Sequence, residues 1–268
     1  MRDVTGTTTM LATFGNPNIG SLAPAAYNAA FEAMDVDFVY LALEPKAIGS
    51  AMEAVRALGL GGGTITKPFK QSVIEYLDDI DDDAKRIGAV NVVVNEGGSL
   101  VGHNSDWHGA MAALLSKTDL KNKRIALLGA GGAARAIAFG LEKNEAKTII
   151  FNRTQESGVQ VAERFNCEFG GNLDNVDESF DIVINATTVG FGENQDGVPI
   201  QASALTSMPL VFDVIPRPIR TKFVDLAESI GCETISGVSM VAYQAMHALK
   251  WLTGVEPSLD VLMEHFSQ

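Results

Sequence analysis

The sequence predicts an α/β fold with two domains, and three observations support this. Apolar runs of strand length alternate with helix-forming segments along nearly the whole chain, as in parallel sheets covered by helices. A glycine-rich turn at residues 129–132 lies between two of these runs. The 268 residues are enough for two modest domains.

The first part of the chain predicts alternating strands and helices, followed by a hairpin. Strands are expected at 8–14, 38–43 and 64–66, and helices at 25–34, 48–58 and from Asp106 to about 115. Gly15-Asn16-Pro17 ends the first strand. Pro68 ends the third, because proline cannot donate to a central ladder. The hairpin is expected where 89–94 and 99–101 flank Asn95-Glu96-Gly97-Gly98.

The segment from Arg124 to Thr154 predicts a βαβ unit. Residues 125–128 are four apolar residues in a row, as in a strand buried on both faces. Good helix formers follow the glycine turn at 133–141, and a second apolar run occupies 148–151. Beyond this unit we expect helices at 155–165, 221–230 and 237–252, strands at 182–185 and 210–214, and a last helix after Ser258.

The turn Gly129-Ala130-Gly131-Gly132-Ala133 predicts a dinucleotide site. Glycines let the backbone approach a pyrophosphate, and the start of the helix offers free N–H groups and a positive dipole end. Ala134 stands at the third glycine of the usual fingerprint. The alternative is a tight turn that binds no ligand, and the two flanking strands favour the dinucleotide.

The end of the second strand favours NADP over NAD. A site for NAD places Asp or Glu there to hold the ribose 2′-hydroxyl, whereas this chain has Asn152-Arg153-Thr154. Arg153 suits a 2′-phosphate, and Thr154 can donate a hydroxyl to it. The alternative is that these residues only cap the next helix.

Composition excludes several classes of partner. The formal net charge of −13 argues against nucleic acid and anionic membrane surfaces. Two distant cysteines suit a reducing cytoplasm and suggest neither a metal site nor a disulfide framework. The acidic run 78–83 is expected to be a solvated loop, because it lacks the pattern of a calcium loop. We also expect no signal peptide and no membrane span.

Lys70 and Asp106 are the candidate reacting pair, because each follows a predicted strand end. Hydride transfer from an alcohol to a nicotinamide requires loss of the hydroxyl proton, and the cofactor supplies the hydride chemistry. A sheltered lysine positioned by an aspartate can carry that proton. The alternative is a surface lysine and a helix-capping aspartate.

A resemblance to the shikimate dehydrogenase family changes this balance. The resemblance covers nearly the whole chain and rests on motifs that occur in the family's order. In chain order, these motifs are Gly15-Asn16-Pro17 with Ser21, Thr66-Lys67-Pro68-Phe69-Lys70, Gly88-Ala89-Val90-Asn91, Asn104-Ser105-Asp106-Trp107-His108-Gly109, the turn from Gly129 to Arg135, Asn152-Arg153-Thr154, Asn185-Ala186-Thr187-Thr188-Val189-Gly190-Phe191, Gly237-Val238-Ser239-Met240 with Gln244, and Trp251-Leu252-Thr253-Gly254.

The resemblance implies NADP-dependent interconversion of shikimate and 3-dehydroshikimate, a step of aromatic biosynthesis in the cytoplasm. It implies a discontinuous substrate domain, 1–106 with 238–268, and an inserted Rossmann domain, 107–237. The protein would be a monomer or homodimer without a metal. The implied site residues are Lys70 and Asp106 for catalysis, Ser21, Thr66, Asn91 and Gln244 for the substrate, and Gly129, Ala130, Gly131, Gly132, Ala133, Asn152, Arg153, Thr154, Thr187, Val214 and Gly237 for NADP.

Some positions depart from the family pattern. Ala23 replaces a second serine, Thr64 an asparagine, Pro216 a tyrosine and Ser157 a basic residue. Each lost hydroxyl contact is worth roughly 0.5–1.5 kcal/mol. The pattern is more similar to shikimate dehydrogenase-like paralogues than to the main biosynthetic enzyme. Quinate or an aminoshikimate is therefore an alternative substrate, and a non-catalytic NADP-binding regulator is an alternative of another class.

Overall fold

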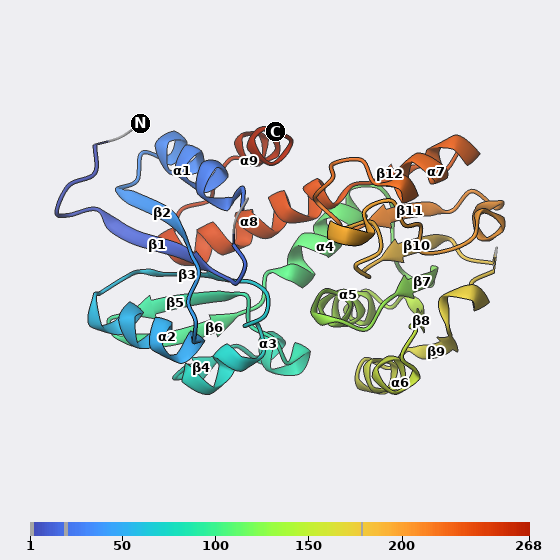
Figure 1. Cartoon of the computed structure of the whole chain (residues 1–268), viewed down its shortest axis with the longest axis horizontal. Coiled ribbons are helices and arrows are strands. Elements are labelled where there is room, and N and C mark those ends of the chain that lie inside the picture. Colours follow the sequence, from blue (N-terminus) through green and yellow to red (C-terminus); the bar gives the residue numbers. More distant parts are fainter. Residues whose placement is uncertain (1–2, 19–20, 178) are drawn as a thin grey trace. The chain divides into compact units, whose positions relative to one another are not determined.

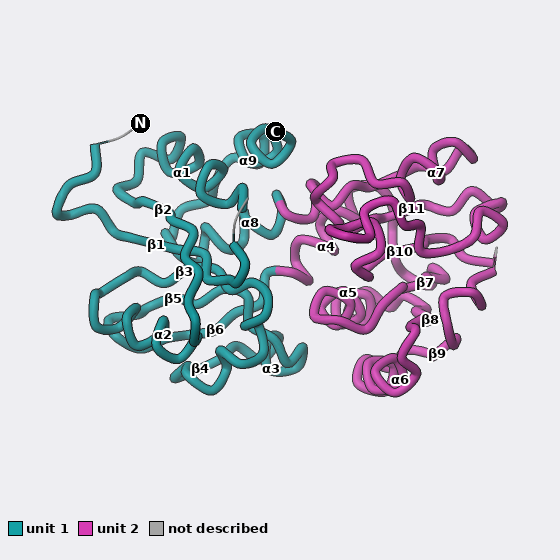
Figure 2. Tube along the Cα trace, viewed as in Figure 1, with its two compact units in different colours: residues 1–105, 242–268 teal, residues 106–241 magenta. Residues whose placement is uncertain are grey.

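The computed structural model describes residues 3–18, 21–177 and 179–268 of the chain. It divides into two compact units, which Figure 2 colours separately. Unit 1 comprises residues 1–105 and 242–268, and unit 2 comprises residues 106–241. The limits expected from the sequence were 106 and 238. Both units combine a sheet with helices, which confirms the predicted α/β class with two domains.

Unit 1 is built on a sheet with the strand order β2-β1-β3-β5-β6-β4 (Figure 1). Its elements are β1 (Thr9–Phe14), α1 (Ala23–Met34), β2 (Phe38–Leu43), α2 (Ile48–Ala57), β3 (Gly62–Ile65), η1 (Ser72–Tyr76), β4 (Asp79–Ile80), α3 (Asp82–Ile87), β5 (Val92–Glu96), β6 (Ser99–His103) and α9 (Leu259–Phe266), with the later part of α8 (Gly237–Thr253).

The sheet of unit 1 is mixed, which corrects the expectation of two parallel sheets. β1 pairs in parallel with β2 and β3, but β5 runs antiparallel to both β3 and β6. The hairpin between β5 and β6, which was predicted, causes this reversal. It also makes β6 parallel to β1 and β3, so these three strands end at the same edge of the sheet.

A pair of glycines lets β3 fit between its two neighbours. Gly62 and Gly63 have φ of +109° and +157°, which disfavour any residue with a Cβ. A Cβ on Gly63 would meet the carbonyl of Ala12 in β1, and one on Gly62 would meet that of Val93 in β5. The backbone of β3 is thus held closely on both sides, directly before Thr64 and a few residues before Thr66 and Lys70.

Helices cover the sheet of unit 1. Ile48, Met52 and Val55 of α2 are buried in one apolar cluster with Ala12 and Phe14 of β1. Helix α1 packs against β2 and against α9, so residues from both ends of the chain share this unit (Figure 1).

The acidic run 78–83 is not simply the solvated loop that was expected. It contains β4, and the side chain of Asp81 accepts a hydrogen bond from the Ala84 N–H at the start of α3. Asp78 pairs with Arg56 at 2.6 Å. The partners in these contacts, such as Arg56, lie outside the run, so the sequence of the acidic run alone did not indicate the contacts.

Unit 2 is a parallel sheet with the strand order β12-β11-β10-β7-β8-β9. Its elements are α4 (Asp106–Leu115), β7 (Arg124–Leu128), α5 (Gly132–Lys143), β8 (Lys147–Phe151), α6 (Gln155–Arg164), β9 (Glu168–Gly171), η2 (Leu173–Asn175), β10 (Ile182–Asn185), η3 (Gly192–Asn194), η4 (Ala202–Leu205), β11 (Leu210–Asp213), α7 (Lys222–Ile230), β12 (Thr234–Ile235) and the start of α8.

The order of strands in unit 2 is that of a doubly wound sheet. The chain moves from β7 outward to β8 and β9, then returns past β7 to β10, β11 and β12. Helix α5 packs on β7 and β8, α6 on β8 and β9, and α7 on β11 and β12. Ligands of such sheets bind at the carboxyl ends of the strands, near the point where the order reverses. Here that point is the end of β7 and β10.

Among the described residues, none of the helices is long and apolar enough to span a membrane.

Candidate active site

The glycine turn joins β7 to α5 at the reversal point of unit 2. Gly129 has φ of +109°, a conformation that favours glycine. A Cβ there would lie 2.8 Å from the Ala186 carbonyl oxygen and 3.3 Å from Cγ2 of Thr187. The turn therefore packs directly against the loop after β10. As a result, Gly129 and Thr187, both predicted to bind the cofactor, lie next to each other.

The beginning of α5 leaves room for a ligand. Gly131 is the N-cap residue and provides no side-chain cap, so the first N–H groups of the helix have no side-chain acceptor at that position. A Cβ on Gly131 or Gly132 would meet no atom within 4 Å. Open space, free donors and the positive end of α5 fit a pyrophosphate. Ala130 and Ala133 are half-buried beside this space.

The segment after β8 presents donors and no carboxylate. Asn152 donates from Nδ2 to the Thr154 carbonyl at 2.8 Å, which shapes the turn. Thr154 is the N-cap residue of α6, but its side chain makes no capping bond. Arg153 is exposed and forms no ion pair with a described residue. The interpretation of this segment as a mere helix cap is thus weakened, and an anion fits it better.

A buried polar network, which sequence reasoning missed, supports the loops after β10 and β11. Asp213 is fully buried and accepts from Thr221 Oγ1 at 2.6 Å, Asn185 Nδ2 at 3.1 Å and the Ile215 N–H at 3.2 Å. Burial raises the pKa of the Asp213 carboxyl, although these hydrogen bonds oppose the shift. Asn185 also accepts from the Thr187 hydroxyl at 2.7 Å.

The same edge brings Val214 and Gly237 together. A Cβ on Gly237 would lie 2.5 Å from the Val214 carbonyl oxygen, so α8 begins in close backbone contact with the segment after β11. The predicted cofactor residues therefore line one edge of the unit 2 sheet.

In unit 1, Lys70 and Ser105 are both hydrogen-bonded to the dipeptide Val90-Asn91. The Val90 N–H donates to the Lys70 carbonyl at 2.8 Å. The side chain of Asn91, next in sequence, accepts from the Ser105 N–H at 2.7 Å and donates to Ser105 Oγ at 3.0 Å. Ser105 directly precedes Asp106, which is only 3 % exposed.

Asn91 is itself fully buried, and its amide holds the backbone of Ser105. Asp106 is the first residue of unit 2, so its meeting with Lys70 stays a prediction. Lys70 is half-buried. In the sequence, Ser105 stood out only as part of the motif that contains Asp106, and nothing in that motif indicated its hydrogen bonds to Asn91.

The loop after β1 lies against the segment after β3. A Cβ on Gly15 would collide with the Thr66 side chain, and the Thr66 N–H donates to the Phe14 carbonyl at 2.9 Å. Ser21 is half-buried just before α1. Ile19 and Gly20 of the predicted loop lie outside the described residues. Gln244 is half-buried in the part of α8 that belongs to unit 1.

Thr64 has a partner that the sequence did not indicate. Its hydroxyl forms a 2.6 Å hydrogen bond with Tyr40 Oη, and both residues are buried. Burial raises the pKa of the Tyr40 phenol, so this group stays neutral and the pair acts as a fixed hydrogen-bonded unit.

Comparison with known proteins decides the family. The model of the shikimate dehydrogenase substrate-binding domain matches residues 13–93, and that of shikimate / quinate 5-dehydrogenase matches residues 111–232. The chain belongs to the shikimate dehydrogenase family. Within this family, the shikimate dehydrogenase (NADP(+)) of Pyrococcus abyssi is 38% identical over 251 residues, which are 92% of this chain and 93% of that one.

Solved structures of the family agree in fold. The shikimate dehydrogenase of Aquifex aeolicus has a TM-score of 0.93 at 32% identity, covering 99% of this chain and 100% of that one. The enzyme of Thermus thermophilus, in complex with NADP(H) and shikimate, has a TM-score of 0.90 at 30% identity, covering 97% and 98%. The family suspected from the motifs and the Rossmann-like fold are both confirmed.

Proposed function

We propose that this chain catalyses the NADP-dependent interconversion of shikimate and 3-dehydroshikimate. Unit 2 is the NADP-binding domain and unit 1 is the substrate domain. The observation that carries the proposal is the hydrogen-bonded frame of Lys70, Val90, Asn91 and Ser105, which ties the segment of the lysine to the residue before Asp106. Relatives at 38% identity named shikimate dehydrogenase (NADP(+)) support the same activity.

The proposed mechanism divides the work between cofactor and side chains. When bound by the residues at the glycine turn, oxidised NADP would supply the acceptor for the hydride that leaves the carbon bearing the reacting hydroxyl. Lys70 and Asp106 take the hydroxyl proton in this direction and return it in the other. Ser21, Thr66, Asn91 and Gln244 hold the hydroxyls and carboxylate of the substrate. The frame around Asn91 keeps these groups in place before the substrate arrives.

Replacing Lys70 by alanine tests the proposal. General acid–base catalysis contributes about 10²–10⁴-fold, so we expect Lys70→Ala to lower kcat for shikimate oxidation by that factor. Affinity for NADPH stays near that of the parent protein, because Lys70 lies in unit 1 and the glycine turn in unit 2.

Lys67→Ala is the matched control. Lys67 is an exposed lysine of the same segment, and we expect it to keep full turnover. A Lys70→Ala protein that retains its kcat contradicts the assignment of the proton carrier.

Quinate or an aminoshikimate remains a second candidate substrate, because the substrate unit has fewer free polar side chains at these positions than the family pattern. Ala23 has none, and the Thr64 hydroxyl already bonds to Tyr40. A panel of shikimate, quinate and aminoshikimate with NADP separates these candidates by kcat/KM. Inert protein that still binds NADP would favour the non-catalytic regulator.

We place the protein in the cytoplasm, because Cys167 and Cys232 are free thiols. We expect a monomer or homodimer. The net charge of −13 disfavours nucleic acid as a partner.

A further inference from the structure

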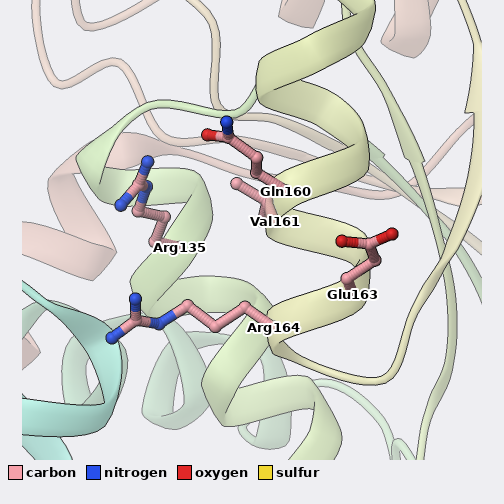
Figure 3. A pocket seen from close by; sticks show the side chains of 5 residues that line it. All are labelled: Arg135, Gln160, Val161, Glu163 and Arg164. Carbon is pink, nitrogen blue, oxygen red and sulfur yellow. The ribbon is translucent and has the colours of Figure 1, made fainter.

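The groove between α5 and α6 of unit 2 is lined mostly by exposed side chains. It has a volume of about 440 Å³, and its lining is Arg135, Gln160, Val161, Glu163 and Arg164. Figure 3 shows the Glu163 carboxylate pointing away from the two guanidinium groups, so charges of opposite sign do not converge there. In unit 1, by contrast, a half-buried cluster of side chains is held together around His103.

His103 is the last residue of β6, and its imidazole contacts two side chains. The Nδ1–H donates a hydrogen bond to Oδ2 of Asp81 at 2.7 Å. The ring stacks on that of Trp251, with the ring centres 4.8 Å apart and the planes at 21°. The imidazole is therefore fixed in both position and orientation, and its side chain is only 19% exposed.

Asp81 connects this imidazole to the segment that leads to Asn91. Its other carboxylate oxygen, Oδ1, accepts a hydrogen bond from the Ala84 N–H at the start of α3, at 2.6 Å. Helix α3 ends at Ile87, shortly before Asn91 in the sequence. The shared carboxylate thus ties the end of β6 to the short helix that precedes a predicted substrate residue.

Trp251 connects the same imidazole to the helix of Gln244. Both residues belong to α8, and they are seven positions apart. Positions i and i+7 lie on the same face of a helix, about 10 Å apart along its axis. The ring of His103 therefore packs on the face of α8 that carries Gln244, the second predicted substrate residue.

The backbone around His103 bonds directly to the segment of Asn91. The His103 carbonyl accepts from the Asn91 N–H at 2.9 Å. Asn104, next in sequence, donates from Nδ2 to the Ala89 carbonyl at 2.9 Å, and the Ser105 N–H donates to the Asn91 side chain at 2.7 Å. A displacement of His103 is therefore transmitted to Asn91 without an intervening residue.

The bond between His103 and Asp81 is not needed to form the local secondary structure. The Asp81 N–H already donates to the Gly102 carbonyl at 3.0 Å, and Oδ1 alone caps α3. The bond through Oδ2 is additional to these contacts. Its effect is to fix the imidazole against α8, between the segments of Asn91 and Gln244.

We propose that His103 is a positioning residue for substrate binding, which holds Asn91 and Gln244 in place through its contacts with Asp81 and Trp251. This inference rests on the proposed function, because it concerns the same substrate site. Side chains that are held in place beforehand lose less conformational freedom when the substrate binds. The role of His103 is therefore in affinity for the substrate and not in proton transfer.

His103→Ala tests the proposal in the full-length protein, with NADP and the substrate that the parent protein oxidises. Release of two side chains predicts a KM for this substrate that rises about tenfold. The kcat should change far less, because weaker binding of ground state and transition state alike raises KM alone. The Kd for NADPH should stay that of the parent protein, because the glycine turn lies in unit 2.

Two conservative variants separate the contacts of the imidazole. His103→Asn keeps a nitrogen donor at the same number of bonds from Cα as Nδ1 but loses the ring. His103→Phe keeps the ring and loses the donor. We expect each variant to recover part of the KM. A merely structural role predicts a smaller fraction of folded protein instead, which lowers kcat and leaves KM unchanged.

His265→Ala is the matched control. This variant removes another half-buried imidazole of unit 1, whose Nδ1–H donates to the Val261 carbonyl within α9 at 2.8 Å. We expect it to keep the KM and kcat of the parent protein. An unchanged KM in His103→Ala, a loss confined to kcat, or an equal rise of KM in His265→Ala overturns the inference and leaves the proposed function intact. If the parent protein oxidises none of shikimate, quinate and aminoshikimate, the proposed function itself fails and this inference falls with it.

Discussion

At the scale of single residues, Asp213 is a carboxyl group without access to water. Its carboxyl oxygens accept hydrogen bonds from the Thr221 hydroxyl, the Asn185 side-chain amide and the Ile215 N–H. These bonds connect the loops after β10 and β11. Both loops carry predicted cofactor residues, Thr187 and Val214. Burial outweighs these donors and raises the pKa, so ionisation of Asp213 costs the folded state free energy.

Asp213→Asn is expected to change the pH dependence of stability. Because the folded pKa of Asp213 lies above 3.8, the ordinary value for an aspartate, the stabilising contribution of this carboxyl is complete below that pH. It is lost as the pH rises through the folded pKa. The free energy of unfolding of the parent protein minus that of Asp213→Asn should therefore fall with rising pH, by at most about 1.4 kcal/mol per unit.

Urea unfolding from pH 4 upward measures this difference, with the exposed Asp196→Asn of the same unit as the matched control. If the stability difference between the parent protein and Asp213→Asn rises with pH instead, the hydrogen bonds outweigh burial and the pKa of Asp213 is lowered, not raised.

At the scale of elements, the sequence predicted best the strands that are apolar throughout. The observed β2 and β10 have the bounds expected from the pattern, and most other elements lie within a few residues of expectation. The sequence did not predict β4, β9 and β12, which have two to four residues each. β4 and β12 have only two residues each, too few side chains to show a period, and β9, Glu-Phe-Gly-Gly, has a single large apolar side chain.

The site was predicted in part, for a physical reason. Turns at strand ends are local, so the sequence indicated the segments of Lys70, Asp106 and the glycines, and the roles of these residues stay predictions. The contact of Tyr40 with Thr64 joins residues 24 apart, and that of Asn185 with Asp213 joins residues 28 apart. Such pairs depend on strand order, which no local pattern specifies. The return of the last helices to the first unit came from the resemblance alone.

Strand β3 allows a prediction about an element. Gly63→Ala forces a Cβ against the Ala12 carbonyl at a φ that disfavours it. We expect a loss of about 3 kcal/mol or more in the free energy of unfolding. Gly6→Ala is the control, because a Cβ there meets nothing within 4 Å. Thermal unfolding compares the two variants, and a Gly63→Ala protein as stable as the control contradicts the close fit of β3.

At the scale of the whole molecule, unit 1 depends on both ends of the chain. Leu262 and Phe266 of α9 are buried, and α9 packs on α1. Deletion of residues 258–268 removes this cover. At about 1.5–3 kcal/mol for each buried side chain, we expect unit 1 to lose about 3–6 kcal/mol of stability.

Unit 2, which we propose binds NADP, should be spared, because it is continuous from 106 to 241. The shortened protein is therefore expected to bind NADPH while its shikimate turnover falls at elevated temperature. Parallel loss of both properties at the same temperature would show that the units unfold together.

The split of unit 1 also sets an order of events during translation. A ribosome releases residues 106–241 before the last helix exists, so the inserted unit can mature while its host is incomplete. Until 259–266 emerges, α1 lacks the helix α9 that packs on it. The nascent polypeptide would thus carry the whole of unit 2 while unit 1 still awaits α9.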